Sequence, residues 1–220
     1  MVGDVKLHFE DYEFNNPFHH LLVEGTSNDD QMNGQLTADR INALGGNDQV
    51  FSGESHDIVN LGSGDDLAFL GDGDDSGYGE DGADTMYGDA GDDFIDGGAG
   101  QDSLYGGDGD DYIDGGIDAD YMKGGAGTDT LVGGEGDDTI YGGDGNDVIF
   151  GGSGNDSISG GAGVTQLYFM AGDGDDFIED LSDNNTIHGG IGHDVISTGN
   201  GSDIVFGGDG NDDIFVRLGN

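Results

Sequence analysis

The stretch GGDGNDVIFGGSGNDSISGG, residues 142–161, contains the same nine-residue pattern twice. Each copy has two glycines, a spacer, a third glycine, Asn and Asp, followed by three residues with Ile at their centre. Counted in steps of nine from Gly25, with a jump of two residues after residue 168, twenty-one such units extend to Phe215, and nineteen carry Asp at position six. Repetition at a fixed period predicts a solenoid, because a unit this short buries its apolar residues only by stacking on its neighbours.

Position eight of the unit is apolar in every copy except the one with Gly77. One aliphatic residue in nine is too sparse for an amphipathic helix, so we expect positions seven to nine to form a short strand. The glycines at positions one, two and four suit turns. Two units then make a coil of 18 residues, in which odd and even units build two sheets. The sequence therefore predicts an all-β fold, a right-handed parallel β-solenoid or β-roll with short strands and glycine turns.

The composition is strongly acidic, with 48 Asp and Glu residues against four Lys and Arg residues and a formal net charge of −44. This charge disfavours nucleic acid and anionic membrane surfaces as partners and favours cations. No apolar run is long enough to span a membrane, and the N-terminus lacks the pattern of a secretory signal peptide. There is no cysteine, so disulfides do not hold the fold. Burial of one thin aliphatic column cannot offset the repulsion between so many negative charges. The fold therefore requires another source of stability.

The motif GGxGxDxUx, seen in GGDGNDVIF, GGSGNDSIS, GGEGDDTIY and GGDGNDDIF, resembles the RTX (haemolysin-type) calcium-binding nonapeptide repeat. The resemblance covers residues 25–215. It implies a parallel β-roll in which Ca²⁺ lies between turns stacked on the same edge, bound by the Asp at position six and by carbonyls of the glycine loops. Carboxylate and carbonyl oxygens are the ligands that Ca²⁺ prefers, and we expect about 10–16 ions.

The predicted calcium ligands are the position-six aspartates. Thr165 and Asn185 replace Asp in two even units, which weakens the row on that edge. The ligands in well-formed loops are Asp48, Asp57, Asp66, Asp75, Asp84, Asp93, Asp102, Asp111, Asp120, Asp129, Asp138, Asp147, Asp156, Asp176, Asp194, Asp203 and Asp212, and the weaker ones, in degenerate loops, are Asp30 and Asp39.

The repeat pattern divides the chain into five parts. We expect an N-terminal cap over residues 1–24, sixteen units over 25–168, an insertion at 169–170, five units over 171–215 and a tail over 216–220. The insertion predicts a bulge near residues 164–170 that interrupts the row of ions. A thin point of the core is expected at Ala68 and Gly77.

Position nine of the odd units carries a column of aromatic residues, interrupted by Lys123. One interpretation is a cross-strand ladder that stiffens the sheet. The other is an exposed strip for a polysaccharide or protein ligand or for self-association. The strip consists of Phe51, Phe69, Tyr87, Tyr105 and Tyr141, and a weaker strip on the even face consists of Ile58, Phe94, Tyr112 and Val148. The outward positions vary, which disfavours a regular ice-binding surface.

Other patterns in the sequence are weaker. Residues 72–77 begin like an EF-hand loop, but the twelfth position is Ala83, where that loop needs Glu. Pairs such as Asp110–Asp111 recur in nearly every unit, so they mark no single catalytic site. His56 and His193 are expected to be solvated loop residues. The motifs HExxH and GxSxG are absent, and we predict no enzyme.

The function predicted from these features is that of a calcium-binding RTX β-roll module of a secreted bacterial protein. Such a chain would leave the cell by type I secretion and fold when it meets extracellular Ca²⁺. Two alternatives stay open. The rod is an extracellular adhesin or spacer that uses its aromatic strip, or it is the C-terminal module of a larger secreted enzyme or toxin.

Overall fold

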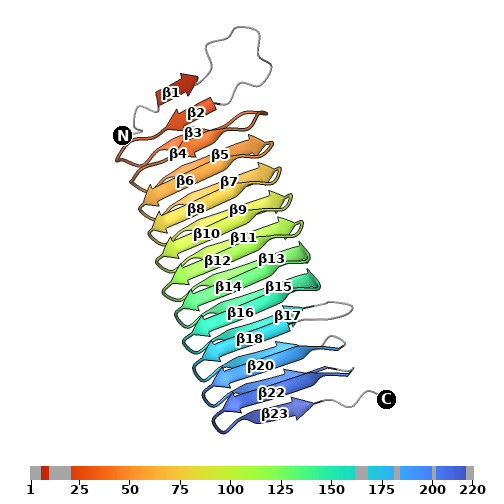
Figure 1. Cartoon of the computed structure of the whole chain (residues 1–220). Coiled ribbons are helices and arrows are strands. Elements are labelled where there is room, and N and C mark those ends of the chain that lie inside the picture. The colour runs from red at the N-terminus through yellow and green to blue at the C-terminus, as the bar shows by residue number, and fades with distance from the viewer. Residues whose placement is uncertain (1–5, 10–20, 162–167, 181–183, 200–201, 217–220) are drawn as a thin grey trace.

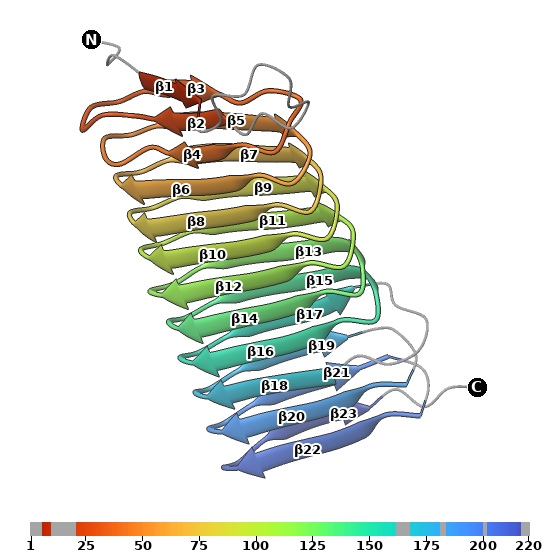
Figure 2. The same ribbon diagram turned by 45° about the horizontal axis from the view of Figure 1, so that its top comes forward.

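The computed structural model describes residues 6–9, 21–161, 168–180, 184–199 and 202–216. Within these ranges the chain forms 23 β-strands, stacked into a rod with β1 at one end and β23 at the other (Figure 1). One sheet has the order β1-β2-β4 and then every even strand to β22, and the other contains the odd strands from β3 to β23. The two sheets lie one behind the other and loops join them at both edges (Figure 2). The all-β parallel β-solenoid is confirmed.

The strands alternate between the two sheets along the chain. The first sheet contains β1 (Lys6–Phe9), β2 (Leu21–Glu24), β4 (Arg40–Asn42), β6 (Ile58–Ser63), β8 (Ser76–Asp81), β10 (Phe94–Ala99), β12 (Tyr112–Ile117), β14 (Thr130–Glu135), β16 (Val148–Ser153), β18 (Tyr168–Asp173), β20 (Thr186–Ile191) and β22 (Ile204–Asp209). The second contains β3 (Gln31–Asn33), β5 (Gln49–Glu54), β7 (Leu67–Asp72), β9 (Thr85–Ala90), β11 (Ser103–Asp108), β13 (Tyr121–Gly127), β15 (Thr139–Gly145), β17 (Ser157–Gly161), β19 (Phe177–Asp180), β21 (Val195–Thr198) and β23 (Asp213–Val216).

Stacked strands follow the predicted register of 18 residues, as in the pairing of Ile95 with Ile113. The strands are longer than expected. Most run from position seven through position three of the next unit, so the first two glycines belong to the strand and not to the turn. Position two is able to stay in the ladder because glycine accepts positive φ there, as Gly98 does at +97°. The prediction of a three-residue strand was therefore too short.

Most of the core consists of position-eight side chains between the sheets. Its fully or almost fully buried members are Val23, Met32, Ile41, Val50, Val59, Ala68, Met86, Ile95, Leu104, Ile113, Met122, Leu131, Ile140, Ile149, Ile158, Phe169, Ile178, Ile187 and Ile196.

Position one also faces the core, which the repeat pattern did not indicate. Leu61 and Leu70 occupy this position and are fully buried. A Cβ added at Gly77 would meet Leu70 Cδ1 at 3.1 Å and the sulfur of Met86 at 3.2 Å. These larger neighbours fill the space that Gly77 leaves, so the predicted thin point of the core is wrong.

The two-residue insertion lies before Tyr168, and its predicted place at 169–170 is wrong. Phe169 pairs with Ile149 and is fully buried, and Met170 pairs with Phe150 on the outer face. The register step there is 20 residues, and it is also 20 between β17 and β19. The extra residues therefore fall between Gly161 and Tyr168, outside the described residues. Thr165, and Leu167 as the expected core residue, lie outside the described residues.

The N-terminal end differs from the rest of the rod. Strand β2 already follows the 18-residue register, because Val23 pairs with Ile41 and is buried. Strand β1 pairs with β2 in the antiparallel direction. The solenoid thus begins before the predicted boundary at residue 25, and within the described residues the strand that departs from its parallel order is β1.

Candidate metal centres

The position-six aspartates stand at the start of each strand and point inward from the loop edge. In each described pair of stacked loops, the backbone N–H of one Asp donates to Oδ1 of the Asp in the next coil, as Asp93 does to Asp111 at 2.9 Å. The odd row of these bonds runs without a break from Asp30 to Asp212, with N···O distances of 2.6–3.2 Å. It passes the insertion unchanged, since Asp156 donates to Asp176 at 2.8 Å. The expected interruption does not occur on this edge.

The even row is regular from Asp39 to Asp147 and resumes where Asn185 donates its N–H to Asp203 at 2.9 Å. Between Asp147 and Asn185 the position-six residue falls within 162–167, outside the described residues. Asn185 is buried like the aspartates but carries no charge. Among the described position-six residues, the two edges therefore differ in charge at Asn185.

The second carboxylate oxygen of most of these residues has no hydrogen-bond donor. Among the described residues, sixteen Oδ2 atoms are buried and lack a partner, which would cost each carboxylate several kcal/mol if nothing else satisfied it. They belong to Asp48, Asp57, Asp66, Asp75, Asp84, Asp93, Asp102, Asp111, Asp120, Asp129, Asp138, Asp147, Asp156, Asp176, Asp194 and Asp203.

Ten of these oxygens lie beside a glycine at position one that leaves space for them. A Cβ added at Gly115, at position one, would meet Asp120 Oδ2 at 2.5 Å and the carbonyl oxygen of Gly133 in the next coil at 2.7 Å. The carboxylate and the carbonyl of the following coil thus share the space of the missing side chain. The same arrangement recurs at Gly97, Gly124 and Gly142.

The first two loops satisfy Oδ2 in a different way. Thr26 donates to Asp30 Oδ2 from its N–H at 2.6 Å and from Oγ1 at 2.9 Å. The N–H of Gln35 donates to Asp39 Oδ2 at 2.6 Å. From the third loop on, most residues at position two have positive φ, and the Oδ2 atoms are without partners. Oδ2 of Asp30 and of Asp39 thus has a donor within its own loop, whereas Oδ1 of Asp30 is buried without a partner.

Burial raises the pKa of the aspartates in these rows. The stacked and neighbouring carboxylates raise it in most of them as well, and the accepted backbone N–H opposes both effects. The pKa rises to about 7 for Asp75, Asp84, Asp93, Asp120, Asp129 and Asp156, and to about 6 for Asp48, Asp57, Asp102, Asp111 and Asp176. It is also raised for Asp66, Asp138, Asp147 and Asp194. Without a cation, the aspartate carboxyl groups along both loop edges of the folded rod thus lose their protons less readily than ordinary Asp.

Calcium fits this donor set. Buried carboxylate oxygens without donors, next to backbone carbonyls, form the all-oxygen surroundings that Ca²⁺ prefers. No three acidic or histidine side chains converge among the described residues, so carbonyl oxygens have to complete any coordination shell. Zinc, which prefers Cys and His, matches these sites poorly.

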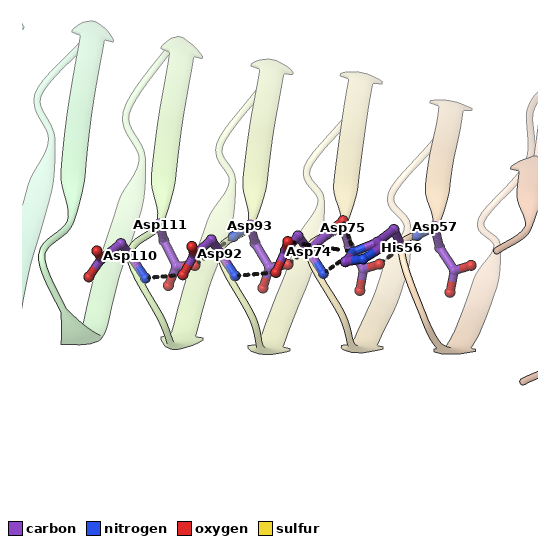
Figure 3. Close-up of polar contacts among 8 residues, drawn as sticks. All are labelled: His56, Asp57, Asp74, Asp75, Asp92, Asp93, Asp110 and Asp111. Carbon is purple, nitrogen blue, oxygen red and sulfur yellow. Dashed lines mark hydrogen bonds and ion pairs between the residues drawn. The ribbon is translucent and has the colours of Figure 1, made fainter. Parts of the chain in front are cut away.

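A second row, at position five, was missed in the sequence. Here the N–H of the later coil donates to the earlier side chain, as Asp110 does to Asp92 at 2.9 Å and Asp92 to Asp74 at 3.1 Å. Figure 3 shows this exposed row beside the buried one. His56 belongs to it, since its Nδ1 accepts the N–H of Asp74 at 2.8 Å. His56 is exposed as expected, but it also has a structural partner. Frequent Asp, Asn or His at position five was the available signal.

The aromatic column of the odd face is a stacked ladder. Ring centroids are 5.1 Å apart for Phe51 and Phe69, 4.9 Å for Phe69 and Tyr87, and 4.7 Å for Tyr87 and Tyr105. Beyond Tyr105 the ladder continues through Tyr121 to Tyr141, with tilted rings 5.7 and 5.6 Å apart. The rings of each stacked pair face each other, which agrees with the interpretation as a stiffening ladder.

The weaker strip on the even face is only partly aromatic. Phe94 and Tyr112 stack at 5.3 Å, and Tyr78 joins them in a tilted contact with Phe94 at 5.6 Å. Tyr78 was not part of the predicted strip. It comes from position nine, whereas Phe94 and Tyr112 come from position seven.

A parallel β-roll with a row of inward-facing aspartates on each loop edge defines a class of repeat proteins. In this class, the groups able to bind a metal ion lie in the loops and not in the core. The family model described as the RTX calcium-binding nonapeptide repeat matches residues 24–59, 33–68, 69–104, 87–122, 99–131, 123–158, 132–167, 170–205 and 190–220. The chain therefore belongs to the RTX calcium-binding nonapeptide-repeat family, and it is a calcium-binding β-roll module.

Among solved structures, a hyperactive, Ca²⁺-dependent, β-helical antifreeze protein from an Antarctic bacterium is similar to this chain. The identity is 20%, the match covers 86% of this chain and 85% of that chain, and the TM-score is 0.39. Nothing about the function of this chain follows from that likeness. No curated protein matches the sequence. Within the described residues, no helix is long and apolar enough to cross a membrane.

Proposed function

We propose that this chain is an extracellular module that stays unfolded without Ca²⁺ and folds when Ca²⁺ binds its loop edges. The observation that carries the proposal is the set of sixteen buried Oδ2 atoms without donors. Each is the carboxylate oxygen of a residue predicted to bind calcium. Because metal ions bind the folded loops and not the extended chain, their binding free energy becomes folding free energy.

The charge of the chain supports an extracellular setting. A net charge of −44 repels the chain from itself, and about 10–16 divalent ions would neutralise much of it. Calcium modules outside the cell bind at about 10⁻⁴–10⁻³ M, well above cytosolic concentrations. An unfolded chain inside the cell and a folded rod outside it are what type I secretion of this module requires. The aspartates have no catalytic role in this proposal.

The test is a calcium titration followed by far-UV circular dichroism. We expect a disordered spectrum in EGTA, a β spectrum in millimolar CaCl₂, and a midpoint at about 10⁻⁴–10⁻³ M. MgCl₂ should not replace CaCl₂, because Mg²⁺ demands rigid octahedral geometry. A β spectrum in EGTA would refute calcium-dependent folding. A midpoint below micromolar Ca²⁺ would refute the secretion argument, since the chain would then fold inside the cell.

A further inference from the structure

A shallow groove of about 540 Å³ runs along the outer face of the odd sheet. It is lined by Tyr87, Tyr105 and Lys123 and by glycines of positions one and two, such as Gly106 and Gly107. The acidic side chains that line it are Asp89, Asp108 and Asp144. The groove is open to solvent and crosses four stacked coils, which corresponds to about 14 Å between the first and the last strand.

The groove lies where the aromatic ladder is interrupted. Lys123 pairs in register with Tyr105 on one side and with Tyr141 on the other, so a slender side chain stands where its neighbours have rings. The ring of Tyr121, at position seven, contacts the rings of both Tyr105 and Tyr141, and Lys123 lines the groove. Lys123 is exposed and makes no ion pair among the described residues.

One wall of the groove holds a side chain in a strained backbone conformation. Asp89 has φ of +73° at position two, where the strand beside it has Gly107. This conformation costs a residue other than glycine about 1 kcal/mol. The chain thus presents a carboxylate at this end of the groove although glycine would fit the backbone better.

We propose that this groove binds a neutral polysaccharide chain. Tyrosine offers both an apolar ring and a hydroxyl, and carboxylates accept hydrogen bonds from hydroxyl groups, so the lining suits a ligand rich in hydroxyls. A polyanion would be repelled by the three carboxylates and by the net charge of the rod. A hydroxyl-rich neutral chain bonds to groups of both signs. The open ends of the groove suit a polymer better than an enclosed small molecule.

The test is affinity gel electrophoresis of the calcium-loaded rod through gels that contain one polymer each. The probes are hydroxyethyl cellulose, laminarin and dextran as neutral polymers, alginate as a polyanion and chitosan as a polycation. We expect at least one neutral polymer to retard the rod. Lys123→Tyr, which completes the ladder, and Tyr105→Ser should each weaken this binding about tenfold, corresponding to about 1.4 kcal/mol. Tyr112→Ser, the matched change on the other sheet, should leave it unchanged.

Circular dichroism and the calcium midpoint of each variant show that the rod is folded, so loss of binding is separate from loss of calcium-dependent folding. Three results would overturn the proposal: no retardation by any neutral polymer, retardation by alginate or chitosan alone, or equal retardation of Lys123→Tyr and the unaltered chain. A loss with Tyr112→Ser as large as with Tyr105→Ser would also place the site elsewhere.

Discussion

The first two loops and the loops that follow have the same Asp at position six but satisfy its carboxylate differently. In the first two, the N–H of Thr26 or Gln35 donates to Oδ2. In the others, position two turns to positive φ and the oxygen is left without a donor, as in Asp111. The two kinds of loop therefore differ in whether a donor within the loop reaches Oδ2. The difference goes with the backbone conformation at position two, where Leu44, Glu80 and Asp89 have positive φ although they are not glycine.

The difference explains how a repeat ends without losing its fold. Hydrogen bonds donated to a carboxylate favour its charged form. In the first two loops such a bond is made to Oδ2 within the loop. The central loops lack it, and we expect calcium to take its place. Three experiments test this contrast, from the largest expected effect to the smallest.

The largest effect concerns pH and should have opposite signs with and without calcium. The central carboxyls have a pKa of about 6–7 in the rod against 3.8 for the ordinary group, so each keeps its proton longer in the folded state. In a chelator, their contribution to stability is fully present below about pH 4 and is lost as the pH rises to about 7, by about 1.4 kcal/mol per pH unit and carboxyl. We expect β structure to increase on acidification from pH 7 to pH 4.

In saturating CaCl₂ the trend reverses, because protons compete with calcium for the same oxygens. Stability should then fall as the pH drops below about 6. Circular dichroism melting curves over this pH range, with and without chelator, measure both trends. The same sign in both conditions would contradict the assignment of the Oδ2 rows as calcium ligands.

The second experiment compares the same substitution in the two kinds of loop. Asp111→Asn should lower the number of bound calcium ions and reduce stability in CaCl₂ by about 3–5 kcal/mol, because it leaves the neighbouring charges of the site without their partner. Asp39→Asn keeps an oxygen for the Gln35 N–H, so we expect no change in bound calcium and a loss of about 1 kcal/mol. Atomic emission after dialysis and urea unfolding provide the two values. Equal effects at both positions would show that the loops do not differ.

The smallest effect comes from converting one loop into the other kind. Gln35→Gly combined with Thr37→Gly gives the second loop glycines at positions two and four, as in the central loops. We expect about 1 kcal/mol lower stability in chelator, since the bond to Asp39 is lost, and a gain in bound calcium that restores stability in CaCl₂. Leu36→Ser, in the same exposed loop, is the control and should change neither value. If the double variant binds no more calcium than the original chain, loop composition does not decide ion binding.

The period, the two sheets and the core column were predictable because they depend on side-chain type at fixed spacing. Position six was predictable for the same reason, and all nineteen aspartates lie at their expected register. The insertion was misplaced because Leu167 and Phe169 are both apolar, and only strand pairing decides that Phe169 enters the core. The repeat pattern has no means to choose between them.

Other features depend on backbone geometry that residue types do not reveal. Position one faces the core, and Leu70 at this position, together with Met86, fills the space beside Gly77. Most units have glycine at position one, which has no side chain to reveal this direction. The position-five row requires knowing that an N–H and a side chain meet across coils, as in Asp92 and Asp110. The groove beside Lys123 arises from the absence of a ring in an otherwise aromatic column.

The two rows of hydrogen bonds run in opposite directions along the rod. At position six, the amide of each coil is completed by the carboxylate of the coil that follows it, as Asp93 is by Asp111. At position five, the amide is completed by the coil before, as Asp110 is by Asp92. When force removes the coil at the C-terminal end, the position-six N–H of the preceding coil therefore loses its acceptor. When force removes the coil at the N-terminal end, the position-six carboxylate of the following coil loses its donor. The rod should resist force differently at its two ends.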